Sequence, residues 1–182
     1  MRRALAWLVG LAMIATAALI GTLTLDEAET AQPFVVDAAV GERAEARLFA
    51  ATVHGVRATE QEVIDASGWR AEGTWVVVDL DVEAMQTEVA SLLSLAELDL
   101  GDRVISASER PESLRSASLR LGIPQSGSLA FELPQGALTG DATLRLGRSL
   151  ETRVDTIVEL RIDLDAVDRS PSIELQETGW AR

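Results

Sequence analysis

The chain has 182 residues and a formal net charge of −13, from 29 acidic and 16 basic residues, and it contains no cysteine. The absence of cysteine excludes a disulfide framework, a thiolate metal site and a thiol nucleophile. The strong acidity argues against a nucleic-acid partner and against adsorption to an anionic lipid surface.

The N-terminal residues have the pattern of a membrane anchor. Arg2 and Arg3 form a short positive head (residues 1–3), and residues 4–25 then contain no charged side chain. This run reaches the about 20 apolar residues that a helix needs to cross a bilayer. Because the positive side stays cytoplasmic, we expect a single-pass plasma-membrane protein with a cytoplasmic N-terminus and an extracellular C-terminal domain.

A cleaved signal peptide is the alternative to a retained anchor. It would have the same positive head and a shorter apolar stretch, followed by a small-x-small cleavage site. Ala15–Thr16–Ala17 has that pattern but lies inside the apolar run. We therefore favour an anchor over residues 4–25 that contacts the lipid bilayer, followed by a short acidic stalk over residues 26–33. Both alternatives export the rest of the chain.

Beyond the stalk, short stretches of alternating apolar and polar residues recur between turn residues, which is typical of a β-sandwich. The clearest covers Thr74–Ala84, where aliphatic residues share one face of the strand and acids share the other. A second, Thr152–Leu164, is expected to be a central strand. Shorter strands are expected at 34–36, 45–54 and 129–133, and a hairpin at 98–105 with its turn at Gly101–Asp102.

These patterns predict an all-β, immunoglobulin-like antiparallel sandwich of about seven to nine strands over residues 34–165. Residues 166–182 are polar and contain Pro171. We expect them to form an exposed C-terminal tail with at most one short strand, Ser172–Leu175.

Three segments carry a resemblance to a known family, and the resemblance as a whole covers about residues 45–148. They are Gly73–Val82, the turn segment Leu98–Val104, and Gly127–Pro134, which reads GSLAFELP. They resemble a bacterial extracellular, immunoglobulin-like (telokin-like) family of unknown function, found on Gram-positive membrane proteins and lipoproteins. Val104 stands where relatives often have an aromatic residue. The resemblance implies a binding or accessory module beside the membrane and no catalytic residues.

The candidate interaction surface is the face of the predicted strand opposite its aliphatic side, with Trp75, Asp79, Asp81 and Glu83. An exposed tryptophan there would be a binding platform, since tryptophan is enriched in binding hot spots. The alternative is that Trp75 covers a sheet edge or packs beneath residues 85–95. The acids are expected to face water.

The sequence gives little support for a catalytic or metal-binding site. His54 is the single histidine, and no nucleophile motif or second metal ligand accompanies it. The acids of Thr74–Ala84, or a second cluster at Asp163, Asp165 and Asp168, would suit calcium, but no calcium-binding loop spacing is present. A carboxylate pair for sugar hydrolysis needs a set separation that a sequence does not show. We therefore expect no cofactor, no metal and no enzyme activity.

The leading functional hypothesis is a non-catalytic, membrane-anchored interaction or accessory module of the bacterial cell envelope, with a membrane or envelope protein as partner. Its alternatives are an exported ligand-binding or sensor domain for calcium or a glycan, released by signal-peptide cleavage, and a hydrolase. An exposed tryptophan at one end of the sandwich would favour the ligand-binding alternative.

Overall fold

The computed structural model describes Trp7, Gly10 and residues 13–16, 33–86, 93–149 and 155–181. The chain divides into two units, Met1–Gln32 and Pro33–Arg182. In the first unit the described residues are helical, but the predicted anchor (4–25) and stalk (26–33) lie mostly outside the described residues. Within the part of the chain that is described, no helix combines the length and hydropathy needed to cross a membrane.

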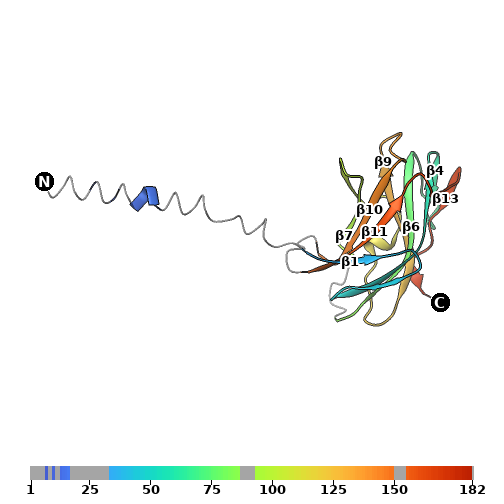
Figure 1. Ribbon diagram of the computed structural model, residues 1–182. Coiled ribbons are helices and arrows are strands. Elements are labelled where there is room, and N and C mark those ends of the chain that lie inside the picture. The colour runs from blue at the N-terminus through green and yellow to red at the C-terminus, as the bar shows by residue number, and fades with distance from the viewer. Residues whose placement is uncertain are drawn as a thin grey trace. The chain divides into compact units, whose positions relative to one another are not determined.

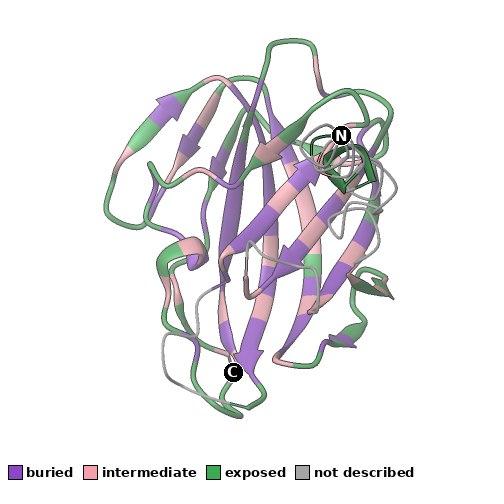
Figure 2. Cartoon of the chain, turned by 90° about the vertical axis from the view of Figure 1, so that its left-hand side faces the viewer, coloured by how far each residue is buried: buried purple, intermediate pink, exposed green. Residues whose placement is uncertain are grey.

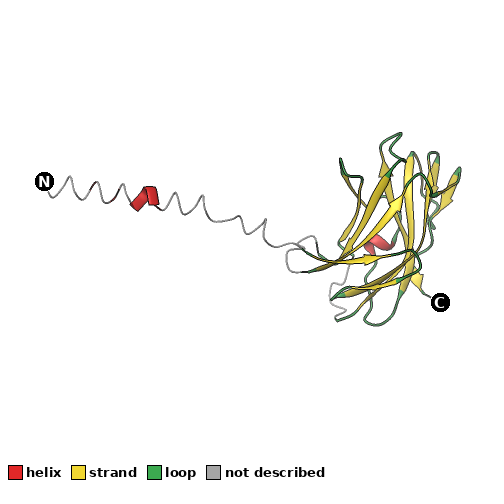
Figure 3. Cartoon of the chain, viewed as in Figure 1, coloured by secondary structure: helices red, strands yellow, loops and turns green. Residues whose placement is uncertain are grey.

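The second unit consists mainly of strands, which form three sheets (Figures 1 and 3). Sheet A has five strands in the order β1-β11-β10-β7-β8. β1 runs parallel to β11, and the other pairs are antiparallel. The strands are β1 (Phe34–Ala38), β7 (Leu95–Asp99), β8 (Val104–Ser106), β10 (Asp141–Gly147) and β11 (Thr156–Asp163).

Sheet B has the order β12-β3-β6-β9-β14, and a short additional strand, β2, pairs with β3. Its two long central strands, β3 and β6, are antiparallel over most of their length. β12 pairs with β3 in parallel, whereas the other strand pairs of this sheet are antiparallel. The strands are β2 (Arg43–Glu45), β3 (Phe49–Thr59), β6 (Thr74–Ala84), β9 (Gln125–Leu133), β12 (Asp168–Arg169) and β14 (Gly179–Trp180).

Sheet C is small and joins segments that are far apart in the sequence, in the order β13-β4-β5. Its first pair is parallel and its second is a hairpin. A short 3-10 turn, η1, precedes β9. These elements are β4 (Glu62–Ile64), β5 (Arg70–Glu72), η1 (Leu114–Ser116) and β13 (Ser172–Glu174).

The main hydrophobic core lies between sheets A and B. It includes Val78 and Leu80 of β6 and Phe131 of β9 from one sheet, and Leu144 of β10 and Leu160 of β11 from the other. Figure 2 shows the buried residues concentrated in the strands and the exposed residues in the connecting loops. Each strand alternates between a core-facing residue and one on the opposite face, so β6 presents its even-numbered residues to this core.

A second, smaller core lies on the other face of sheet B, which we call the outer face. There Trp75 and Val77 of β6 contact buried residues of sheet C, including Val63 of β4 and Ile173 of β13. Sheet C therefore forms a third layer over one part of sheet B. The remaining outer face carries the polar side chains described below.

Several sequence predictions are confirmed in detail. β6 covers Thr74–Ala84 with the predicted aliphatic face inward. The hairpin β7–β8 turns at Gly101, whose φ of 87° favours glycine. β11 has neighbours on both sides, as expected for an inner strand, although residues 152–154 of the predicted segment lie outside the described residues.

The predicted strand at residues 45–54 is wrong in its bounds. The structure has two strands there, β2 ending at Glu45 and β3 starting at Phe49, and they form a hairpin. β3 then continues to Thr59 through a register shift between Val53 and Gly55. This β-bulge inserts one extra residue, which breaks the simple alternation that a sequence pattern follows.

The short strand predicted at 172–175 is present as β13, but the exposed tail predicted for the rest of 166–182 and the domain boundary at residue 165 are wrong. Residues 168–180 contribute one short strand to sheet C and two to sheet B. Ile173 and Leu175 are buried in the second core. The physical reason is that the outer face of sheet B needs an apolar cover, and this distant segment supplies part of it.

Candidate functional site

The three predicted acids of β6 lie on the outer face of sheet B, and each has a partner in a neighbouring strand. Along β6 these acids come after Trp75 and Val77, which lie on the same face and are covered by sheet C. The outer face of β6 therefore changes from apolar to acidic where sheet C ends. Their partners come from β2 and β3 on one side and from β9 on the other.

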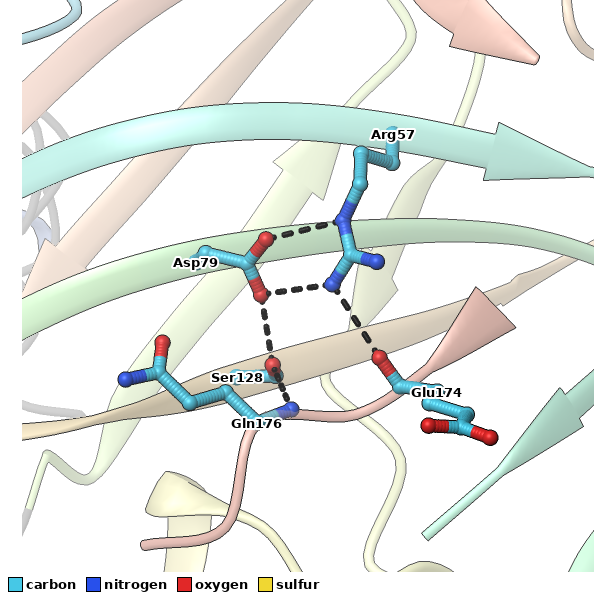
Figure 4. A network of polar contacts seen from close by, with 5 residues as sticks. All are labelled: Arg57, Asp79, Ser128, Glu174 and Gln176. Carbon is cyan, nitrogen blue, oxygen red and sulfur yellow. Dashed lines mark hydrogen bonds and ion pairs between the residues drawn. The ribbon is translucent and has the colours of Figure 1, made fainter. Parts of the chain in front are cut away.

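Asp79 is the centre of a network of four other residues (Figure 4). The guanidinium of Arg57 donates to both carboxylate oxygens of Asp79, at 2.8 and 2.9 Å. The Ser128 hydroxyl donates to Asp79 at 2.6 Å and accepts from the Gln176 backbone N–H at 2.8 Å. Arg57 also donates to the Glu174 carbonyl at 3.2 Å. The network therefore fastens the C-terminal segment onto sheet B.

Asp81 bonds to two side chains with potential chemistry. Its carboxylate lies 2.9 Å from Nε2 of His54 and accepts from the Ser126 hydroxyl at 2.5 Å. His54 stands at the β-bulge of β3, and its side chain is about half exposed. Here the carboxylate lies between the imidazole and the hydroxyl, whereas a serine–histidine–aspartate relay requires the imidazole in the middle. The Asp81 carboxylate therefore bridges the imidazole and the hydroxyl.

Glu83 is buried and pairs with Arg43 of β2. The carboxylates of Glu83 and then Glu45 raise the pKa of Arg43. The expectation that Glu83 faces water is wrong, because β2 pairs beside β3 in sheet B and its Arg43 side chain reaches Glu83. Glu83 and Asp79 each pair with an arginine on the same face, whereas Asp81 bonds to His54 and Ser126.

The acids do not assemble into a cation site in the described part of the chain, where no group of three or more suitable ligands occurs. Asp163 and Asp165 instead order a turn: Asp163 accepts from the Asp165 N–H at 2.9 Å, and Asp165 accepts from the Gly140 N–H at 3.0 Å. Asp168 lies in β12 and is exposed.

Trp75 is fully buried, so the expectation of an exposed platform at this residue is wrong. It packs beneath sheet C, and residues 87–92 of the segment predicted as its alternative cover lie outside the described residues. Trp69 contacts it edge to face at a centroid distance of 6.2 Å. The Arg110 guanidinium lies over both rings, at 5.3 Å from Trp69 and 6.0 Å from Trp75.

The exposed tryptophan of the folded unit is Trp180, with 60% of its surface accessible. It lies in β14 at a groove of about 660 Å³. Sequence reasoning missed this residue because it placed residues 166–182 in a tail. The signal was the sequence Gly179–Trp180 itself, a large aromatic residue in an otherwise polar segment. The groove is lined by Ser126, Gln176, Glu177, Thr178, Gly179, Trp180 and Ala181.

A second group of exposed apolar residues lies at the start of the second unit (Pro33–Arg182). Phe34, Val35 and Val40 have 72%, 48% and 55% of their surface accessible. Phe34 and Val35 start β1, which forms one edge of sheet A, and Val40 follows in the next turn. We call residues 34–40 the entry segment. Because neighbouring residues of a strand point to opposite faces, Phe34 and Val35 are exposed on the two sides of this edge strand.

Comparison with known proteins identifies the fold and no family. No protein-family model matches the chain, and no curated protein matches it at a significant level. A solved structure of a "putative lipoprotein" from Staphylococcus aureus subsp. aureus NCTC 8325 superposes with a TM-score of 0.51 at 9% sequence identity. The match covers 75% of this chain and 97% of the staphylococcal chain.

The two proteins share a β fold. At 9% identity the likeness is one of fold, and it transfers no residue roles. The immunoglobulin-like family that the sequence resembles is not confirmed by these comparisons.

Proposed function

We propose that the chain is a membrane-anchored, extracytoplasmic interaction module of the bacterial cell envelope, which binds a protein partner and does not catalyse a reaction. The observation that carries this proposal is the entry segment. It presents Phe34, Val35 and Val40 to solvent directly after the apolar and acidic N-terminal residues. In the sequence, this segment directly follows the predicted anchor and stalk.

Two further features support the proposal. The acids of β6 each bond to a neighbouring side chain, and they form no metal-binding group among the described residues. The staphylococcal protein of the same fold is described as a "putative lipoprotein", which is compatible with a place at the envelope. The runner-up is a ligand-binding domain, and the groove at Trp180 favours it.

The test is affinity capture of the full-length chain from gently solubilised host membranes. We expect one membrane protein to co-purify reproducibly with the natural chain. Phe34→Asp should reduce its recovery by about tenfold or more, because a charge in an apolar contact costs at least the ~1.4 kcal/mol that a tenfold change represents.

Val104→Asp is the matched control. Val104 is also exposed, at 51%, and it lies in β8 at the opposite edge of sheet A from β1. Its replacement should leave recovery of the partner unchanged. Absence of any partner from the natural chain, or equal loss with both variants, would contradict the proposed role of the entry segment.

A further inference from the structure

One side of the edge strand β1 has no partner strand in the described part of the chain. β1 (Phe34–Ala38) ends sheet A, and among the described residues it pairs with β11 alone (Figure 1). Native proteins usually protect such an edge with lysines, a proline or a bulge, because its free N–H and C=O groups can pair with another chain. β1 has the sequence Phe-Val-Val-Asp-Ala, which contains no proline and no basic residue. Its edge is therefore open to an added strand.

The pairing with β11 determines which backbone groups of β1 are free. The Phe34 N–H donates to the Asp155 carbonyl at 3.1 Å, so the backbone of Phe34 faces β11. Successive residues of a strand direct their N–H and C=O groups to opposite sides, so the even-numbered residues of β1 face β11 in the parallel register. Val35 and Asp37 therefore direct their N–H and C=O groups to the open edge.

Apolar side chains are accessible on both faces of this strand. Phe34 is 72% exposed and Val35 is 48% exposed, and as neighbours they point to opposite faces of sheet A. In β-strand addition the backbone bonds give affinity, and alternate side chains of the added segment give specificity. A segment beside β1 would therefore contact Phe34 with the side chains on one of its faces and Val35 with those on the other.

Asp37 indicates which charge the added segment carries. Its side chain is exposed and lies on the same face of β1 as Val35. This carboxylate makes no hydrogen bond or ion pair with another described residue. A second copy of this chain, with its net charge of −13, would bring further carboxylates to the edge, which is unfavourable. A basic residue opposite Asp37 would instead form a favourable cross-strand pair.

We propose that the protein partner adds an extended segment to the open edge of β1, as a sixth strand of sheet A. The segment pairs with the backbone of Val35 and Asp37, and it carries apolar residues and one lysine or arginine, which lies beside the Asp37 carboxylate. This inference rests on the proposed function, to which it adds the binding mode and the chemistry of the partner's segment.

The test is amide hydrogen exchange of the full-length chain, measured alone and in complex with the protein that it captures. The probe for capture is the detergent-solubilised membrane fraction of the host. We expect the Val35 and Asp37 N–H groups to exchange about tenfold or more slowly in the complex, because a hydrogen-bonded amide exchanges only after its bond opens. The Val104 N–H, at the other edge of sheet A, should exchange at the same rate in both samples.

Val35→Pro and Val104→Pro form a matched pair of variants, because each removes an N–H group from an open edge of sheet A. The Ala107 N–H donates to the Ala96 carbonyl of β7 at 2.8 Å, so by alternation the Val104 N–H points away from β7. Proline is tolerated on an edge strand where the N–H faces solvent, so circular dichroism should show both variants folded.

Val35→Pro should reduce recovery of the partner by about tenfold or more, since the proline ring removes a donor and obstructs the incoming strand. Val35→Ala keeps the N–H, so it should retain most of the recovery. Val104→Pro should leave recovery unchanged.

Unchanged exchange of Val35 and Asp37 in the complex would overturn the strand addition, whether or not Val35→Pro folds. Full recovery with Val35→Pro, or equal loss with Val104→Pro, would overturn it as well. If Phe34→Asp still lost the partner in that case, the proposed function would stand, because the entry segment would then bind through its side chains. Capture of no protein by the natural chain would contradict the proposed function and this inference together.

Discussion

Replacing Trp75 by alanine is expected to lower the free energy of unfolding by about 3–5 kcal/mol, the usual range for truncating a buried tryptophan. Trp75 is fully buried and fills the space between sheet B and sheet C, where it contacts Trp69 edge to face. Its removal would leave a cavity that three short strands cannot close. Urea unfolding of the full-length chain, followed by far-UV circular dichroism, measures the loss.

Trp75→Phe is the matched control for this prediction. The indole N–H of Trp75 has no hydrogen-bond partner among the described residues, so phenylalanine loses no bond and keeps most of the apolar contact. We expect this variant to lose less than half as much stability as Trp75→Ala. Equal losses would show that the indole makes a polar contact that the second core requires.

Removing the Asp65 carboxylate is the second large effect we expect. Asp65 lies in the turn between β4 and β5 and is buried. Its Oδ1 accepts from the Ser67 N–H at 2.9 Å, the Ser67 hydroxyl at 2.7 Å and the Trp69 N–H at 3.0 Å. Its Oδ2 accepts from the Glu112 N–H at 2.7 Å, which joins a second loop to this turn.

Asp65→Ala would leave these donors without an acceptor, and we expect a loss of about 3 kcal/mol in urea unfolding. Asp65→Asn tests the role of the second oxygen. Its amide oxygen can still accept from Ser67 and Trp69, but its NH₂ group would face the Glu112 N–H. We expect an intermediate loss. A loss below about 0.5 kcal/mol for the alanine variant would contradict this role of the carboxylate.

The same carboxylate predicts a pH dependence of stability. Burial raises the pKa of Asp65, but the bonds from Ser67, Glu112 and Trp69 outweigh burial, and the pKa is lowered from its ordinary value of 3.8. A lowered folded-state pKa means that this stabilisation is present above the unfolded value and is lost as the pH falls through the folded value. The stability difference between the natural chain and Asp65→Asn should therefore shrink below about pH 4.

The strand β6 shows how far the sequence could be interpreted. Its bounds and its core-facing residues follow from alternation, because side chains in a strand point to opposite faces. The same alternation puts Trp75 and Val77 on the second face, ahead of three acids. That change from apolar to acidic marks where a third layer ends, and it was a usable signal for the burial of Trp75.

The segments that cover Trp75 and Val77 could not be predicted from alternation. Ile173 alternates with polar neighbours, so a short strand at 172–175 was predictable, but its place beside Val63 depends on pairing between distant segments. Burial of Glu83 likewise depends on β2 bringing Arg43 across the sheet. The groove at Trp180 exists because the C-terminal segment returns to β9, a contact that no local pattern encodes.

The most direct test of the proposed interaction role is photo-crosslinking in intact host cells, with Phe34→p-benzoylphenylalanine compared with Val104→p-benzoylphenylalanine. The adducts are then measured by intact mass. We predict a protein adduct from position 34 and none from position 104, on a chain that retains its N-terminal residues. No protein adduct from position 34, equal adducts from both positions, or a chain that lacks its N-terminal residues would contradict a membrane-anchored interaction module.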